Sequence, residues 1–223
     1  MDNYPEERRL DYPRNWEDQY RNTGFVHQWR DKYSDLFEDY QGSTRLGTLD
    51  LFPQYALMFL LRRDKQIQSI TWYKLASTPE RSKNRVQTLK HWDTMRRWMG
   101  QYNFRTIQDK LHQTGFKGFT GEPDLFCWEQ DTERWFFAEA KGKDRLTETQ
   151  IRWFHSCREA LGDLADIRIY RLEPIPTRPL TTRWNTQRTR TDGPAMLRQK
   201  QERIEIRVPG KACEVAIPGR SLA

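Results

Sequence analysis

The chain is poor in cysteine and has no long apolar run. Its 223 residues include only three cysteines, Cys127, Cys157 and Cys213, which are far apart and form no CxxC pair. An odd, scattered set of this kind argues against a disulfide framework or a structural zinc site and favours a reducing, cytoplasmic location. The longest apolar block, Tyr55 to Leu61, is far too short to cross a membrane. We therefore expect a protein that acts away from the membrane.

Several catalytic signatures are missing as well. The sequence has no GxxxxGK(S/T) loop, which excludes a P-loop nucleotide hydrolase. It has no GxSxG motif and no Cys/His arrangement that would suggest covalent hydrolysis. The four histidines are scattered without the spacing of metal ligands. A catalytic site, if there is one, must be built from other side chains.

Charge is abundant but unevenly spread. The net charge is +7, and residues 174–223 hold ten Lys/Arg against four Asp/Glu, a net of +6. Residues 1–40 hold six Lys/Arg against ten Asp/Glu, a net of −4. The basic surplus is compatible with phosphate binding but does not establish it, because charged runs are most often solvated surface.

The stretch from Gly121 to Gln150 is the most informative part of the sequence. Two strand-like segments, GEPDLFCW and WFFAEAKG, flank the polar connection Glu129 to Arg134, a pattern typical of a β-hairpin. A turn centred between residues 131 and 132 would place Asp124 opposite Glu139. It would also place Phe126 opposite Phe137 and Trp128 opposite Trp135.

This register gathers charge at one end of an aromatic face. Asp124 would share a face with Phe126 and Trp128, and Glu139 and Lys141 would lie on the same face of the partner strand. Opposed side chains are about 5 Å apart at Cβ, and like charges at that distance are destabilising unless something lies between them. The pattern therefore indicates a cation site, and the alternative is a solvated sheet edge with scattered charges.

The same residues resemble a known family. Pro123-Asp124 followed by Glu139-Ala140-Lys141 resembles the PD-(D/E)xK nuclease signature. The run from residue 139 to Gln150 and Trp153 is similar to the VRR-NUC branch, whose pattern is G-x-PDL, then E-x-KG-x-D-x-L, then a Gln before an aromatic residue on a helix. The Fanconi-associated nuclease and several prokaryotic and phage nucleases carry this domain. The resemblance covers residues 115 to about 172, about a quarter of the chain.

The resemblance implies a role for each motif residue. Asp124 and Glu139 would bind a divalent ion together with the backbone carbonyl of Ala140, and oxygen ligands of this kind suit Mg²⁺ or Mn²⁺. Lys141 would position or activate the attacking water and offset charge developing on the phosphorus. Gln150 corresponds to a family position that faces the active site. It would equally close a capping box with Thr147, and both explanations stay open.

Other residues are candidates on weaker grounds. Lys143 and Arg145 are expected phosphate contacts, with ordinary loop charge as the alternative. Related nucleases place a further acidic residue on a helix before the first strand, and Glu80 and Asp109 are both candidates. Glu122 stands where the family usually has an apolar residue. We interpret it as a solvated strand start rather than an additional ligand.

The resemblance implies an α/β fold with a restriction-endonuclease-like core, a mixed sheet flanked by helices. We expect a mainly helical region over 1–76, the nuclease core over 77–173, and a basic Pro/Arg-rich extension over 174–223. In the core, residues 116–120 would form the first strand, the hairpin the next two, and residues 167–170 the last. Further helices are expected over residues 53–63, from residue 77, after residue 103 and over residues 147–161. Further strands are expected over residues 66–75 and 204–208. An amphipathic helical stripe is expected over residues 26–40.

These expectations lead to a function. The chain is predicted to be a Mg²⁺- or Mn²⁺-dependent nuclease that hydrolyses phosphodiester bonds in DNA, in repair, recombination or phage DNA processing. Family members often act on flaps or junctions, and small ones can dimerise, so a homodimer or a recruitment partner is also open. The alternatives are a catalytically inactive nucleic-acid-binding module with the same fold, or an adaptor.

Overall fold

The computed structural model of the chain describes residue 5, residues 7–22, 29, 31–32, 49, 51–78 and 85–176, and the backbone of 206–208 and 211–213. The chain divides into two compact units, Met1–Pro174 and Ile175–Ala223. None of the described helices is long and apolar enough to span a membrane.

The first unit is built on a mixed five-stranded sheet. Two parallel pairings, β1 with β5 and β5 with β4, are followed by two antiparallel pairings, β4 with β3 and β3 with β2. The expected α/β class with a mixed sheet is therefore confirmed. In spatial order the strands are β1 (Glu7–Tyr12), β5 (Ile167–Pro174), β4 (Arg134–Lys141), β3 (Leu125–Glu129) and β2 (Gln68–Thr71).

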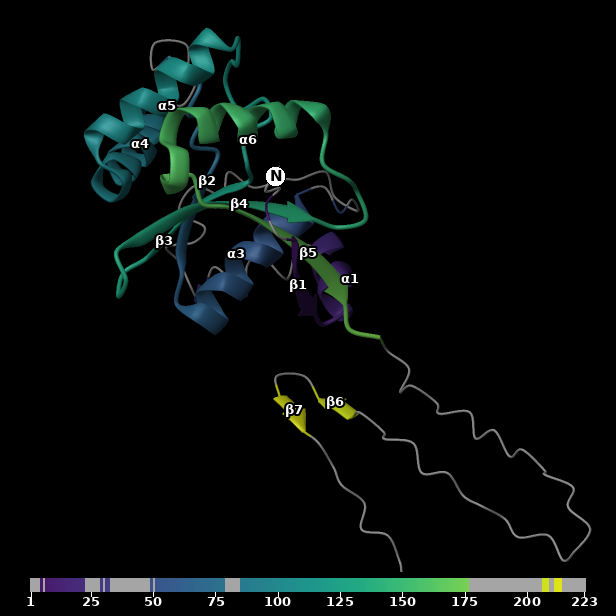
Figure 1. The fold of residues 1–223 in the computed structure, drawn as a ribbon. Helices are drawn as coiled ribbons and strands as arrows, with labels where there is room; N and C mark the ends of the chain where they lie inside the picture. The colour runs from purple at the N-terminus through teal and green to yellow at the C-terminus, as the bar shows by residue number, and fades with distance from the viewer. Residues whose placement is uncertain are drawn as a thin grey trace, which may run out of the picture. The chain divides into compact units, whose positions relative to one another are not determined.

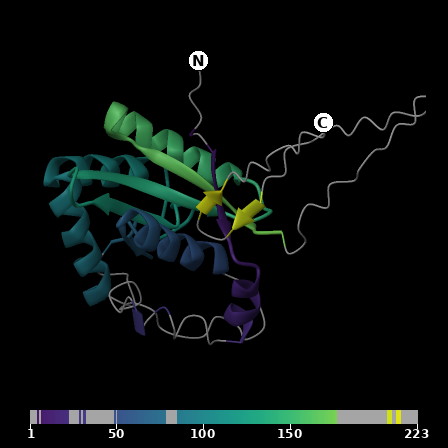
Figure 2. The same ribbon diagram turned by 90° about the horizontal axis from the view of Figure 1, so that it is seen from below.

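Helices cover both faces of this sheet, as Figure 1 and Figure 2 show. On one face lie α1 (Asn15–Arg21) and α3 (Phe52–Lys65). On the other lie α4 (Arg85–Met99), α5 (Gln101–Gln113) and α6 (Glu148–Leu161), with the short 3₁₀ helix η3 (Gly162–Leu164) after α6.

The alternation of side chains along the central strands produces two separate cores. On β3, Leu125 and Cys127 are buried under α3, whereas Phe126 and Trp128 are buried with α4, α5 and α6. The second core is rich in aromatic contacts, and Phe137 meets Trp153 of α6 edge-to-face at 5.1 Å between ring centroids. Truncating a buried aromatic of this kind to alanine typically costs about 3–5 kcal/mol. This core holds α6 against the end of the hairpin.

The register predicted for the hairpin is confirmed. Phe126 pairs with Phe137 and Trp128 with Trp135. The period of two along each strand and the polar turn fix this register, because a one-residue slip would turn the aromatic face toward solvent.

The strand expected over Phe116–Thr120 is wrong. That segment forms turns, with Gly115 and Gly118 at φ values of 84° and 65°, and its β-pairing among the described residues is an isolated bridge from Gly118 to Ala76. Its place beside β3 is taken by β2, which falls within the strand expected over residues 66–75. Left-handed backbone is incompatible with a continuous strand, which explains the difference.

The first 76 residues do more than form helices, since they supply both edge strands of the sheet. β1 was not predicted, because its sequence ERRLDY alternates weakly and most of its residues are exposed. The expected helix over 53–63 is confirmed by α3, with a proline in its first turn. Most of the stripe over 26–40 lies outside the described residues. Of its members, Trp29 is described, and it stacks on Phe59 at 4.2 Å.

The remaining expectations are met in part. The helix over 147–161 and the last strand are confirmed by α6 and β5. The helix expected after residue 103 begins earlier, at Gln101. Of the helix start expected at 77–80, Ser77 and Thr78 are not helical, and residues 79 and 80 lie outside the described part of the chain. In the second unit, β6 (Ile206–Val208) pairs antiparallel with β7 (Lys211–Cys213), as a late hairpin.

Candidate active site

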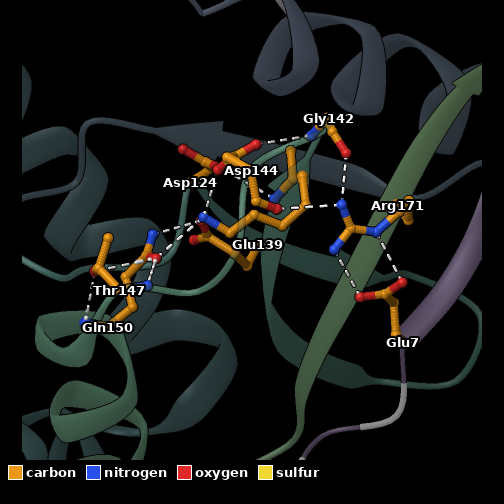
Figure 3. A network of polar contacts seen from close by, with 10 residues as sticks. Glu7, Asp124, Glu139, Gly142, Asp144, Thr147, Gln150 and Arg171 are labelled. Carbon is orange, nitrogen blue, oxygen red and sulfur yellow. Dashed lines mark hydrogen bonds and ion pairs between the residues drawn. The ribbon is translucent and has the colours of Figure 1, made fainter.

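The hairpin brings the two carboxylates of the motif together. Asp124 directly precedes β3, and continuing the register beyond the Leu125–Ala138 pair places it opposite Glu139. One Asp124 oxygen, Oδ2, accepts a hydrogen bond of 2.9 Å from the backbone N–H of Ala140. Figure 3 shows Asp124 and Glu139 with Gln150 beside them. The site thus lies where β3 begins and β4 ends, beside the first turn of α6.

Glu139 is the most deeply buried carboxylate of this group. Only 2% of its side chain is exposed. Its Oε1 accepts from Gln150 Nε2 at 2.5 Å and lies 3.0 Å from Lys141 Nζ. Its Oε2 is buried and has no hydrogen-bond partner among the described residues. A buried carboxylate oxygen without a partner is costly in its charged form, so it favours either a proton or a bound cation.

The ammonium of Lys141 is fixed from three sides. Its Nζ lies 3.0 Å from Glu139 Oε1, 2.9 Å from Asp144 Oδ2 and 3.0 Å from Gln150 Oε1. An ammonium has three donors, so each has an acceptor here. With 4% of its side chain exposed, Lys141 has little freedom to turn away.

Gln150 makes the contacts expected from both explanations that the sequence left open. Its amide nitrogen bonds Glu139, whereas its Oε1 accepts from Lys141 and from the backbone N–H of Thr147 at 3.0 Å. The Thr147 hydroxyl accepts in turn from the Gln150 backbone N–H, which completes a capping box at the start of α6. The helix cap therefore also orients a side chain of the site.

Burial dominates the electrostatics of the site. It raises the pKa of both Asp124 and Glu139, and the neighbouring Asp124 charge raises the pKa of Glu139 further. Burial alone would lower the pKa of Lys141, but the carboxylates of Glu139 and Asp144 outweigh it and hold that pKa above its ordinary value. Three carboxylates, Asp124, Glu139 and Asp144, thus lie near one ammonium, and a bound cation would favour the ionised form of Asp124 and Glu139 over the protonated form that burial favours.

The donor set fits a small divalent cation. Among the described residues no group of three His, Cys, Asp or Glu side chains lies together as a metal site. Asp124 and Glu139 are two carboxylates, and Mg²⁺ characteristically uses one or two together with waters and substrate phosphates. The unpartnered Oε2 of Glu139 agrees with such a ligand. The backbone of Ala140 is adjacent to both.

The other candidate residues are more dispersed. Lys143 and Arg145 are exposed on the loop after β4, next to Lys141 in sequence. Asp109 is exposed on α5. Glu80 lies outside the described residues. The structure thus brings together Asp124, Glu139, Ala140, Lys141 and Gln150. A further acidic side chain, Asp144, contacts this group through Lys141 Nζ, and it comes from the loop after β4 rather than from a helix.

The interpretation of Glu122 as a solvated strand start is wrong. Its carboxylate accepts hydrogen bonds from the backbone N–H groups of Lys74 at 3.0 Å and Leu75 at 2.7 Å. Burial raises its pKa to about 8. Nearby, the hydroxyl of buried Tyr73 donates to the Pro123 carbonyl at 2.8 Å. Glu122 thus ties the segment after β2 to the residues that precede Asp124.

Sequence reasoning also missed the contacts that support the loop after β4. Asp144 lies within the run that resembles the VRR-NUC pattern, but that resemblance did not indicate its contact with Lys141. Its Oδ1 accepts from the Gly142 N–H at 3.1 Å while its Oδ2 holds Lys141. Arg171 of β5 and Glu7 of β1 complete this arrangement (Figure 3), and no motif pointed to either.

Compared with protein-family models and with curated proteins, the chain matches none. Its function is therefore inferred from the motif and from the geometry of these side chains.

Proposed function

We propose that the protein is a Mg²⁺- or Mn²⁺-dependent nuclease that hydrolyses phosphodiester bonds in DNA, with the restriction-endonuclease-like core of the PD-(D/E)xK enzymes. One observation carries the proposal. The buried Glu139 carboxylate has Lys141 and Gln150 on one oxygen and an unpartnered second oxygen, and Asp124 is its cross-strand neighbour.

Asp124 and Glu139 are the residues that would hold the metal, with the Ala140 carbonyl as a third oxygen. When bound, the cation would supply Lewis acidity at the scissile phosphate and lower the pKa of a bound water. The Ala140 N–H fixes Asp124, and Gln150 fixes Glu139, so both carboxylates are oriented before a ligand arrives. Preorganised charge of this kind accounts for much of the rate enhancement in enzymes.

Lys141 would act on the phosphate side of the site. Its ammonium is positively charged at neutral pH, because its pKa is raised by the surrounding carboxylates. By exchanging one of its three protein acceptors for the attacking water, it would orient that water, and its charge would offset the negative charge that develops on the phosphoryl oxygens. Lys143 and Arg145, exposed on the adjoining loop, would contact flanking phosphates.

The proposal is tested by a cleavage assay on a panel of DNA substrates. Purified protein is incubated with linear duplex, single-stranded, flapped, four-way-junction and supercoiled DNA, each with Mg²⁺, Mn²⁺ or EDTA. We expect cleavage that requires the metal, and the preferred substrate would define any structure selectivity. Binding without cleavage on every substrate, whether or not metal is added, would instead support an inactive DNA-binding module.

A further inference from the structure

Arg171 connects the first strand of the chain to the loop that follows Lys141. Its Nε and Nη2 donate to the two carboxylate oxygens of Glu7 at 2.8 and 2.9 Å, a bidentate pair between β5 and β1. Its Nη1 donates to the carbonyls of Gly142 at 2.6 Å and Asp144 at 3.1 Å. One guanidinium therefore holds a neighbouring strand and a loop at once, as Figure 3 shows.

The two carbonyl bonds distinguish this contact from an ordinary surface ion pair. Gly142 and Asp144 flank the exposed Lys143, and the Asp144 side chain holds the Lys141 ammonium at 2.9 Å. Gly142 is further tied to Asp144, because its N–H donates to Asp144 Oδ1. The path from Glu7 to Lys141 consists of consecutive hydrogen bonds, and the two ends are 134 positions apart in the sequence (7 and 141).

We propose that Arg171, oriented by Glu7, is a positioning residue that fixes the loop 142–145 and through Asp144 the ammonium of Lys141. This inference rests on the proposed nuclease function for its catalytic consequence, whereas its structural part stands without it. The planar fork of arginine suits the task, since a single lysine ammonium cannot reproduce a bidentate carboxylate pair and two further carbonyl bonds in fixed geometry. The same loop carries Lys143 and Arg145, so their direction would depend on Arg171 as well.

The chain offers a matched control on the same two strands. Arg9 of β1 and Glu173 of β5 form an ion pair of 3.9 Å with Arg9 largely exposed. Arg9 also lies directly opposite Arg171 in the parallel register. Removing Arg9 breaks its cross-strand pair with Glu173. Removing Arg171 breaks the cross-strand pair with Glu7 and also the hydrogen bonds to the loop carbonyls. Both variants lose an arginine charge from the β1–β5 pair, so a loss that follows only from that charge should appear in both.

The experiment compares Arg171→Met, Arg171→Lys and Arg9→Met in the full chain. Hydrogen exchange of residues 142–146 is measured by mass spectrometry, and kcat and KM are measured on the best DNA substrate. We expect faster exchange over 142–146 and a fall in kcat of about tenfold or more in both Arg171 variants, because small misplacements of reacting groups are costly. KM should change less than kcat, and Arg9→Met should resemble the wild type in both readouts.

The outcomes separate this inference from the function on which it rests. Unchanged exchange over 142–146 in Arg171→Met would overturn the positioning role, as would full recovery of kcat in Arg171→Lys, since charge alone would then suffice. A wild-type protein that cuts no DNA would contradict the nuclease proposal. In that case, faster exchange in the Arg171 variants but not in Arg9→Met would still support the structural link.

Discussion

Gln150 Nε2 donates to Glu139 Oε1 at 2.5 Å, while the same side chain closes the capping box at the start of α6. The side chain that satisfies the helix N-terminus is thus also a neighbour of the proposed metal ligand. The position of α6 against the hairpin, set by aromatic packing such as Phe137 against Trp153, therefore bears directly on the geometry of the site.

Substitution of Thr147 and Gln150 should separate these two roles. Thr147→Ala removes the cap hydroxyl but leaves Gln150 bonded to Glu139 and Lys141, so it should lower the free energy of unfolding by about 1 kcal/mol with little effect on cleavage. Gln150→Ala removes the contacts to Glu139 and Lys141 as well and should reduce kcat by about tenfold or more. Urea unfolding and cleavage rates measure the two effects. Equal activity in both variants would show that Gln150 only caps the helix.

Gly121 is expected to tolerate no side chain. It has a φ of 71°, and a Cβ there would lie 2.7 Å from the backbone oxygen of Thr149 in the first turn of α6. Gly115 has a similar φ of 84°, but a Cβ there meets no atom within 4 Å in the described part of the chain. Gly115→Ala should therefore cost only the left-handed strain, about 1–2 kcal/mol.

Gly121→Ala should cost clearly more than its control, because the backbone of the helix must move. Chemical denaturation of the two variants compares them under one condition. If Gly121→Ala and Gly115→Ala lower the free energy of unfolding by the same amount, the close approach of Gly121 to α6 does not contribute to stability.

Glu122 should make the stability depend on pH. Its pKa is raised by burial from 4.5 to about 8, so the folded protein keeps a proton that the unfolded chain releases. The stabilisation from this group is complete below pH 4.5 and is lost as the pH rises through about 8. Between these values the free energy of unfolding of the wild type should fall relative to Glu122→Gln by up to about 1.4 kcal/mol per pH unit.

Urea titrations of wild type and Glu122→Gln at several pH values, in EDTA, provide the test. The neutral glutamine supplies the matched reference, since its contacts do not titrate in this range. A constant difference between the two proteins from pH 5 to 8 would mean that Glu122 is ionised throughout.

Divalent cations should stabilise the folded protein. A ligand that binds only the folded state at 100 times its Kd adds about 2.7 kcal/mol to the free energy of unfolding. Mg²⁺ or Mn²⁺ should raise the thermal midpoint of the wild type but not of Asp124→Asn, and Asp131→Asn in the exposed hairpin turn is the control. Because the pKa values of Asp124 and Glu139 are raised, protons compete with the cation.

The rise in midpoint should therefore grow between about pH 5 and 8, measured by differential scanning fluorimetry. An equal rise in wild type and Asp124→Asn would place the bound cation elsewhere in the protein.

Much of the site could be predicted from local sequence pattern. The register that sets Asp124 against Glu139 follows from the period of two along each strand and from the position of the polar turn. Gln150 follows from a capping-box spacing at the start of an amphipathic helix. These relationships are short in sequence, so the residues alone specify them.

The parts that escaped prediction depend on partners distant in the chain. In its local sequence Glu122 resembles a solvated charge. Its hydrogen-bond donors are the backbone N–H groups of Lys74 and Leu75, more than 45 positions earlier in the chain. Arg171 and Glu7 are 164 positions apart, and nothing in either local sequence indicates the other. The strand β1 was missed for the same reason, since its parallel partner β5 defines it rather than its own pattern.

The most direct test of the central claim is single-turnover cleavage of one end-labelled DNA substrate in Mg²⁺ by wild type, Glu139→Gln and Glu129→Gln. Glu129, at the far end of the same hairpin, is the matched control. We expect Glu139→Gln to bind the DNA but to cut it about 100-fold more slowly, because it loses a carboxylate that would hold the metal. We expect Glu129→Gln to cut at nearly the wild-type rate. Equal cleavage rates in wild type and Glu139→Gln would contradict the proposed site.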